Sequence, residues 1–205
     1  MCPVDNLKFN PKNIEKLISE KRKKELPPLE TLEKFMKGKT YKGTFVDFGC
    51  GVGYFTFPAE KYFETVIGVD MEPKMIDYAL KNIPEGSSAK FILSHENSTA
   101  LPSSIANVVF MSNVFHEVYS PKLVVNELKR LLKEEGELWV LEWSKREMEE
   151  GPPLDHRISR DELIEMIADD EIKFIGDIHI SDKFYGAKFT MNEELYLKFY
   201  KNEKL

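Results

Sequence analysis

From Thr44 onward the chain alternates between short, continuous hydrophobic runs and segments whose hydrophobic residues recur three or four positions apart. The first pattern is typical of strands that are buried on both faces, and the second is typical of helices that cover a sheet. The predicted strands are 44–48, 64–70, 90–94, 106–112 and 137–143. Helices are predicted over 54–63 and over 121–132, and we expect Gly136 to end the second of these. Between them, Pro73 opens a helix that carries Met75, Ile76, Ala79 and Leu80 on one side.

The last part of the chain changes pattern. Ser159 and Glu162 match a capping box, which predicts the start of a further helix. Two more predicted strands, 173–180 and 183–191, are separated by only two residues, and so short a gap favours a hairpin. The sequence therefore predicts an α/β fold: a Rossmann-like, doubly wound, seven-stranded and mostly parallel sheet with an antiparallel C-terminal strand, preceded by an N-terminal helical extension.

Residues 1–43 are predicted to form that extension. Asn10 and Pro11 match an N-cap and first-turn pair, and the prolines at 27–28 separate the first helix from a second one. A basic run at 21–24 lies between the two predicted helices. It is either a solvated face or a lip that attracts an acidic substrate.

The composition is that of one globular domain, with 205 residues of which 42% are hydrophobic and 31% are charged. No hydrophobic run approaches the ~18 residues of a membrane helix, and the N-terminus lacks the layout of a signal peptide, so we expect a soluble, cytoplasmic protein. The net charge of −6 argues against avid, sequence-independent binding to nucleic acid. Cys2 and Cys50 cannot build a disulfide framework or a cysteine-based zinc site.

The glycine-rich stretch 46–56, VDFGCGVGYFT, follows a predicted strand, and Asp70 ends the next strand. A glycine turn between a strand and a helix lets a ligand approach the backbone, and a carboxylate at the end of the second strand accepts hydrogen bonds from ribose hydroxyls. The glycines run G-x-G-x-G, with Tyr54 where a dinucleotide site has its last glycine. Asp47, just before the loop, would repel a pyrophosphate and attract an ammonium group. The pattern indicates an adenosine-containing cofactor with a cationic amino-acid end.

With these motifs the sequence resembles the class I S-adenosylmethionine-dependent methyltransferases from Thr44 to Met191. The resemblance implies that 44–205 form a domain that binds S-adenosylmethionine and that 1–43 cover its site as a lid. It implies that Asp70 holds the ribose and that the methionine part of the cofactor is held by Asp47, Gly49, Gly51 and Gly53. The segment 96–102, ENSTALP, is similar to the family's adenine-binding segment and presents Asn97 there. The predicted cofactor site also includes Cys50, Met71, Ser98 and Asn113.

Two segments, GPPLDHR at 151–157 and FYGAKF at 184–189, are similar to small-molecule methyltransferases related to the ubiquinone and menaquinone biosynthesis enzymes. This resemblance implies a small, hydrophobic or aromatic methyl acceptor and in-line transfer to it. Five aromatic residues either line a flat apolar pocket or belong to the core: Phe48, Tyr54, Phe115, Trp143 and Tyr185.

His116 follows the fourth predicted strand and is the candidate general base. Its imidazole, with an ordinary pKa near ~6.5, suits removal of a proton from an acidic acceptor, and a packed or solvated loop histidine is the alternative. Glu117 either orients this imidazole or faces water. The cluster of Asp155, His156 and Arg157 either lies over the mouth of the site or forms an ion pair within its loop.

Other functions stay open at this point. A protein or RNA methyltransferase would use 21–24 as its docking patch, and a non-catalytic module would bind S-adenosylmethionine without turnover. A nicotinamide dehydrogenase is disfavoured by Asp47 and Tyr54. No constellation of carboxylate and histidine ligands is evident, so we expect no metal site. The sequence assigns neither the acceptor atom nor an oligomeric state.

Overall fold

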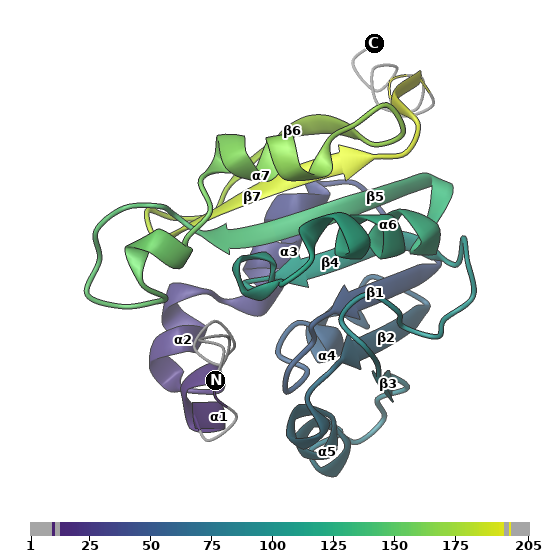
Figure 1. Cartoon of the computed structure of the whole chain (residues 1–205). Coiled ribbons are helices and arrows are strands. Elements are labelled where there is room, and N and C mark those ends of the chain that lie inside the picture. The colour runs from purple at the N-terminus through teal and green to yellow at the C-terminus, as the bar shows by residue number, and fades with distance from the viewer. Residues whose placement is uncertain (1–9, 11–12, 195–196, 198–205) are drawn as a thin grey trace.

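The computed structural model describes residue 10, residues 13–194 and residue 197; Cys2 and Pro11 lie outside the described residues. Its central element is a seven-stranded sheet in the order β3-β2-β1-β4-β5-β7-β6 (Figure 1). The strands are β1 (Thr44–Phe48), β2 (Thr65–Asp70), β3 (Lys90–Leu93), β4 (Ala106–Ser112), β5 (Leu132–Trp143), β6 (Lys173–His179) and β7 (Phe184–Thr190). Within the described residues, we find no helix with the length and hydrophobicity needed to cross a membrane.

The strand pairing confirms the predicted fold class. β1 pairs in parallel with both β2 and β4. The pairs β2–β3 and β4–β5 are also parallel. β7 runs antiparallel between β5 and β6, which confirms the predicted hairpin. Because the strand order reverses between β1 and β4, the carboxyl ends of these two strands flank the crevice where sheets of this kind bind ligands.

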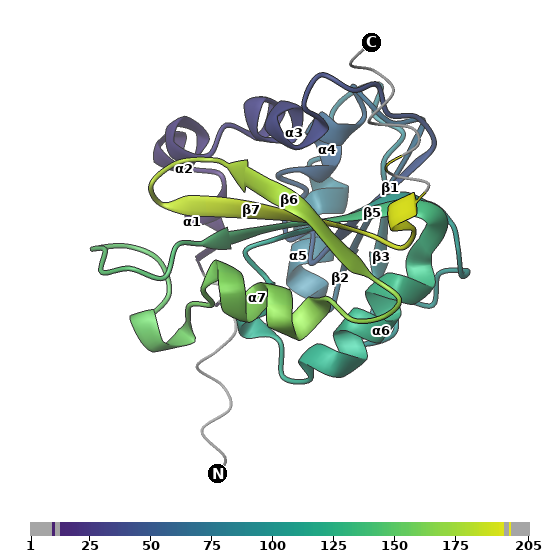
Figure 2. The same cartoon turned by 90° about the horizontal axis from the view of Figure 1, so that it is seen from above.

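Helices cover both faces of the sheet (Figure 2). They are α1 (Ile14–Leu17), α2 (Glu20–Glu25), α3 (Pro28–Met36), α4 (Thr56–Ala59), α5 (Pro73–Lys81), α6 (Pro121–Leu131) and α7 (Arg160–Ile167). α3 and α4 lie on one face and α6 and α7 on the other. Two single-turn helices follow β4 and β5: η3 (Phe115–Glu117) and η4 (Leu154–His156).

The helix α3 belongs to the core of the domain. The fully buried ring of Phe35 stacks on Trp139 of β5, with 5.4 Å between the ring centroids, and meets Phe110 of β4 edge to face. Aromatic contacts of this kind add to the gain from burying apolar surface. Within the described part of the predicted extension, α3 thus belongs to the core, whereas α1 and α2 have no buried residues.

Two predicted helices differ from the structure. The helix predicted over 54–63 is confined to α4, because the turns of the glycine loop continue through residue 55 and Gly53 is left-handed, with φ 83°. Leu80 is 49% exposed, because the buried side of α5 consists of Met75, Ile76 and Ala79, and Leu80 lies one residue further round the helix.

Two boundaries were also wrong. Gly136 lies inside β5 and does not end α6, which stops at Leu131. A Cβ at Gly136 would lie 3.0 Å from the carbonyl oxygen of Ala106, so this glycine permits close strand contact. The basic run at 21–24 lies within α2, because the Ser19 side chain accepts a hydrogen bond from the Arg22 backbone N–H and begins that helix. The capping box of Ser159 and Glu162 is confirmed.

Candidate functional site

A cavity of about 1040 Å³ lies at the carboxyl ends of β1, β2 and β4, at the crevice that the strand order predicts. Its walls are formed by α1 and α2, the glycine loop, the residues after β2, the turn η3 and the loop between β5 and η4. Nine carboxyl side chains and three lysine or arginine side chains line it. A cavity with this balance of charge favours a ligand that carries positive charge.

The glycine loop is bound to the end of β2 through Asp70. The Asp70 carboxylate accepts hydrogen bonds from the backbone N–H of Gly51 and of Glu72, each at 2.8 Å. Gly49 and Gly51 are left-handed, with φ 74° and 54°. A Cβ at Gly49 would lie 2.5 Å from Val114, so only glycine leaves the loop this close to the turn after β4.

Asp47 is a buried carboxyl group at the end of β1. Its side chain is 2% exposed, and its Oδ2 accepts a hydrogen bond from the Thr56 hydroxyl at 2.6 Å. Burial raises the pKa of Asp47 to about 7, and the nearby Asp70 charge adds to that rise while Thr56 opposes it. A cation brought close to Asp47 would therefore stabilise its ionised form.

Two buried side-chain atoms that line this cavity have no hydrogen-bond partner within the part of the chain that the structure describes: Nε of Arg22 and Oδ1 of Asn113. One is a charged donor and the other is an acceptor. Asn113 also has left-handed backbone geometry, with φ 55°, at the end of β4. Buried polar atoms are normally satisfied, so a pair without partners in one cavity marks a place for a ligand that has both an anionic and a donor group.

His116 and Glu142 form a buried pair on another wall. The imidazole Nδ1 lies 2.8 Å from Oε2 of Glu142, and the two side chains are 5% and 1% exposed. The backbone N–H of Phe115 also donates to Glu142, at 2.8 Å. Burial by itself lowers the pKa of His116, but the charges of Glu142 and Glu117 outweigh it and hold this pKa above its ordinary value. Sequence reasoning missed Glu142; its only signal was a single acidic residue in the otherwise hydrophobic run LWVLEW.

Comparison with known proteins identifies this arrangement. Residues 46–140, which carry β1, the glycine loop, Asp70 and β4, match the family model described as a methyltransferase domain. The chain carries an S-adenosylmethionine-dependent methyltransferase domain. Its fold matches the crystal structure of a SAM-dependent methyltransferase from Aquifex aeolicus with a TM-score of 0.81 and 26% identity, over 90% of this chain and 100% of the other.

Curated relatives match over shorter segments. The 2-methyl-6-phytyl-1,4-hydroquinone methyltransferase of Synechocystis is 26% identical over 53% of this chain and 35% of its own length. A second relative, from Schizosaccharomyces pombe, is 27% identical over 47% of this chain and 37% of its own length, and it is described only as a methyltransferase. The matched segments thus span little more than a third of the length of these relatives.

Most of the predicted cofactor residues lie at the cavity. Those that line it are Asp47, Gly49, Cys50, Gly51, Asp70, Met71 and Asn113. Gly53 shapes the loop from behind, where a Cβ would lie 2.6 Å from the ring of Phe57. Asn97 and Ser98 are exposed and are absent from the lining, whereas their neighbour Glu96 lines it. The turn after β3 thus directs residue 96, one position earlier than expected, toward the cavity.

The aromatic residues divide between the cavity and the core. Phe48, Tyr54 and Trp143 line the cavity, together with Phe184, which sequence reasoning did not single out. Phe115 is 1% exposed and belongs to the core. Tyr185 packs against the same core and donates its hydroxyl hydrogen to the Ile158 carbonyl. Adjacent residues of a strand point to opposite faces, which explains why Phe184 and not Tyr185 reaches the cavity.

The cluster after β5 forms no ion pair of the expected kind. The guanidinium of Arg157, which is 4% exposed, donates to the backbone carbonyls of Pro152, Glu150 and Arg146. Arg157 therefore holds the loop in shape from inside. His156 lines the cavity, and the exposed Asp155 does not.

The helix α2 is attached to the opposite wall by an ion-pair network. Lys21 pairs with Glu150 of the loop after β5, and Lys183, just before β7, pairs with Glu150 and with Glu25 at 2.7 Å. Together these contacts join α2, this loop and the start of β7 around the cavity. The basic run therefore faces partly inward, and Lys23 pairs with Glu20 on the outside.

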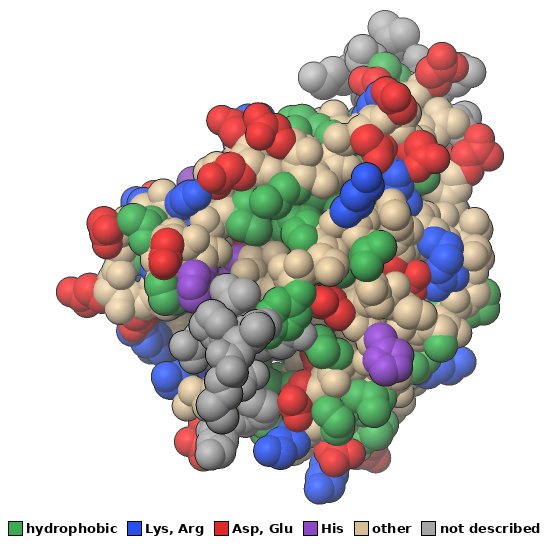
Figure 3. All heavy atoms as spheres, viewed as in Figure 1, with side chains coloured by type: hydrophobic (Ala, Val, Ile, Leu, Met, Phe, Trp, Pro, Cys, Tyr) green, Lys and Arg blue, Asp and Glu red, His purple; other side chains and the backbone are tan. Residues whose placement is uncertain are grey.

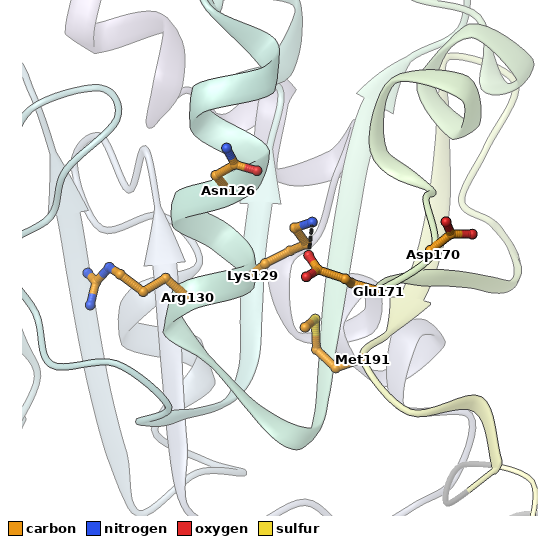
Figure 4. A pocket seen from close by; sticks show the side chains of 6 residues that line it. All are labelled: Asn126, Lys129, Arg130, Asp170, Glu171 and Met191. Atoms are coloured by element: carbon orange, nitrogen blue, oxygen red, sulfur yellow. Dashed lines mark hydrogen bonds and ion pairs between the residues drawn. The ribbon is translucent and has the colours of Figure 1, made fainter.

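A second hollow lies near the C-terminal end of α6 and is lined by Asn126, Lys129, Arg130, Asp170, Glu171 and Met191 (Figure 4). Its two basic side chains already have acidic partners, because Lys129 pairs with Asp169 and Glu171, and Arg130 pairs with Glu127. Acidic side chains gather over α7 and the turn after it (Figure 3): Asp161, Glu165, Asp169, Asp170 and Glu171 are exposed there.

Proposed function

We propose that this chain transfers the methyl group of S-adenosylmethionine to a small, hydrophobic or aromatic acceptor. The observation that carries the proposal is the coincidence, in one cavity, of the Asp70-anchored glycine loop with the two unpartnered atoms of Arg22 and Asn113. An amino-acid zwitterion offers both the anion and the donor that these two atoms lack. The residues present therefore fit the cofactor.

Each part of the cofactor has a proposed partner. Arg22 binds its carboxylate, and Asn113 together with Asp47 binds its ammonium group. Asp70 binds the ribose hydroxyls, while Gly49, Cys50, Gly51 and Gly53 allow the backbone to approach the methionine part. Met71, Asn97 and Ser98 stay proposed contacts of the adenosine part, to which we add Glu96 because it lines the cavity. The bound cofactor supplies a sulfonium-activated methyl group, so this chain need only hold the acceptor in line and exclude water.

The acceptor region is proposed to lie among Trp143, Phe184 and Tyr54. These rings line the cavity, and Trp143 and Phe184 pack together with 4.4 Å between their centroids. Flat apolar walls favour an aromatic or hydrophobic acceptor. The relative named as a hydroquinone methyltransferase supports a small aromatic substrate. We further propose that α1 and α2, within the extension 1–43, serve as the lid of the domain 44–205.

Calorimetric titration tests the proposal. Purified protein is titrated with S-adenosylmethionine, S-adenosylhomocysteine and NAD, beside the variants Asp70→Ala and Asp77→Ala. We expect saturable binding of the two sulfur compounds, loss of it in Asp70→Ala, and no change in Asp77→Ala, whose carboxylate is exposed on α5. Binding of NAD in place of the two sulfur compounds would overturn the proposal and would mean that the glycine loop binds phosphate.

A further inference from the structure

Glu142 occupies an unusual place for a carboxylate. It lies near the end of β5, is 1% exposed, and is surrounded by donors rather than water. The backbone N–H groups of Phe115 and His116 donate to its Oε1, at 2.8 and 3.3 Å, and the imidazole of His116 meets its Oε2 at 2.8 Å. Trp143 also donates its backbone N–H to Oε2, at 3.3 Å, so both carboxyl oxygens accept backbone donors, and three such donors stabilise the ionised form. Glu142 thus keeps a negative charge buried behind His116.

This contact determines the tautomer of His116. A carboxylate can only accept, so the imidazole proton sits on Nδ1 and the lone pair remains on Nε2. Nε2 lies on the side of Glu117, whose Oε1 is 3.7 Å away, and both His116 and Glu117 line the cavity. A proton that arrives at Nε2 is then stabilised by carboxylates on both sides of the ring.

Three charged groups and one neutral hydroxyl surround the ring. Glu142 on β5 and Glu117 on η3 favour the protonated imidazole, and the guanidinium of Arg157, in the loop after β5, opposes it. Tyr185 on β7 is close enough for Glu142 to raise the pKa of its hydroxyl, which burial already raises, so Tyr185 stays neutral. The net balance favours proton uptake by His116.

Resting on the proposed function, we infer that Glu142 is a positioning residue that holds His116 as the proton acceptor, and that the molecule methylated here presents a weakly acidic hydroxyl of the phenol class. In the transfer, the acceptor's O–H bond breaks and its proton passes to Nε2 of His116. The oxygen electron pair forms the bond to the methyl carbon, and the electron pair of the carbon–sulfur bond stays on sulfur. A neutral amine has a free lone pair and has no need of a proton acceptor before transfer, whereas a hydroxyl needs one.

The first test observes His116 directly, without any acceptor. Nitrogen-15 spectra of histidine-labelled protein report the tautomer and titration of His116 in the wild type, in Glu142→Gln and in Glu147→Gln. We expect the Nδ1–H tautomer in the wild type and a fall in the pKa of His116 by about 1 unit or more in Glu142→Gln, since it loses an opposite charge within hydrogen-bond distance. Glu147→Gln removes the same charge from an exposed site in the following loop and leaves His116 unchanged. An Nε2–H tautomer in the wild type would overturn the inference.

The second test identifies the acceptor class. Formation of S-adenosylhomocysteine is followed with a panel of phenols and hydroquinones, their methyl ethers, and the matching anilines. We expect turnover only with free hydroxyls, at least 10-fold lower kcat in His116→Gln, and in Glu142→Gln a rate profile displaced along the pH axis with KM little changed. The inference would be contradicted if only the anilines were methylated, if no compound in the panel were methylated, or if phenols were methylated at a rate that does not depend on His116. The proposed function fails separately, in the titration with S-adenosylmethionine, and binding by the variants shows that they are folded.

Discussion

The guanidinium of Arg22 lies over the ring of Tyr54, with 5.1 Å from its central carbon to the ring centroid. Tyr54 lies in the turns of the glycine loop, and its hydroxyl donates to the carbonyl of Leu26 at 2.8 Å, so the end of α2 and the loop are in contact. Burial lowers the pKa of Arg22, against the raising effect of Tyr54 and Glu25. A buried guanidinium with an unpartnered Nε gains most from an anion.

If Arg22 binds the cofactor carboxylate as proposed, its replacement should weaken binding of that group in particular. We expect Arg22→Met to lower the affinity for S-adenosylmethionine roughly 10- to 150-fold, the equivalent of the ~1.5–3 kcal/mol of a hydrogen bond to a charged group. Decarboxylated S-adenosylmethionine, which lacks that carboxylate, should bind wild type and variant equally. Calorimetry with both ligands measures the difference. Equal losses for the two ligands would mean that Arg22 only supports the fold, and Lys23→Met on the exposed side of α2 controls for the lost charge.

The protonation of Asp47 makes stability depend on pH. Its folded pKa is raised to about 7 from an ordinary value of 3.8, so between these values the unfolded chain has lost a proton that the folded protein keeps. The contribution of Asp47 to the free energy of unfolding therefore falls as pH rises through this window and is fully lost above it. Asp47→Asn should flatten this part of the profile in urea unfolding experiments. An unchanged slope in the variant would show that other groups cause it.

We expect the same carboxyl group to link cofactor binding to proton release. An ammonium group near Asp47 lowers its pKa, so S-adenosylmethionine should displace a proton when the pH is below about 7. Titrations in two buffers with different ionisation enthalpies count the protons released. Release should vanish well above that pH and in Asp47→Asn. Release that persists in Asp47→Asn would assign the proton to another group.

The variant Gly49→Ala tests whether the cofactor lies close to the backbone of the glycine loop. Gly49→Ala should abolish binding of S-adenosylmethionine and destabilise the fold, because the new Cβ would lie 2.5 Å from Val114 at a left-handed φ of 74°. Gly38→Ala has a similar φ of 78° and nothing within 4 Å, so it should cost only the ~1–2 kcal/mol of backbone strain and leave binding intact. Thermal unfolding and calorimetry on both variants separate strain from obstruction. Full binding by Gly49→Ala would contradict the proposed approach of the cofactor.

A buried ion pair fastens α3 to the sheet. Lys188 on β7 pairs with Glu137 on β5, and its ammonium group also donates to the carbonyl of Phe35 at 3.2 Å, at the end of α3. Glu137→Gln leaves a buried ammonium without its counter-charge, and we expect a loss of about 3–5 kcal/mol in the free energy of unfolding. Replacing both residues together, with Glu137→Gln and Lys188→Met, should cost less than the two single losses added, because no unpaired ammonium is left and the amide oxygen can still accept from Trp139 Nε1. Urea unfolding of the single and double variants measures this, and additive losses would argue against coupling.

Local patterns predicted the elements well. Val46 and Val109, each 0% exposed, lie in strands that the sequence revealed as continuous hydrophobic runs, because parallel strands under helices are buried on both faces. The capping box of Ser159 and Glu162 was equally visible, since both partners lie within one helical turn. The prediction for Gly136 failed because a glycine suits both the end of a helix and a close approach of backbone, and the approach here involves the carbonyl oxygens of Lys133 and Ala106.

The sequence by itself determined the α/β architecture, the glycine loop, and the placement of Asp47 and Asp70 at neighbouring strand ends, because burial and turn geometry are encoded within a few residues of each other. Only the tertiary structure decided that Glu142 stands behind His116, 26 residues away, and that Glu25 reaches Lys183 across 158 residues. A charged side chain does not specify its partner in advance. The partner depends on which chain segments the sheet and its helices bring together, and the electrostatic balance of the site is set at that stage.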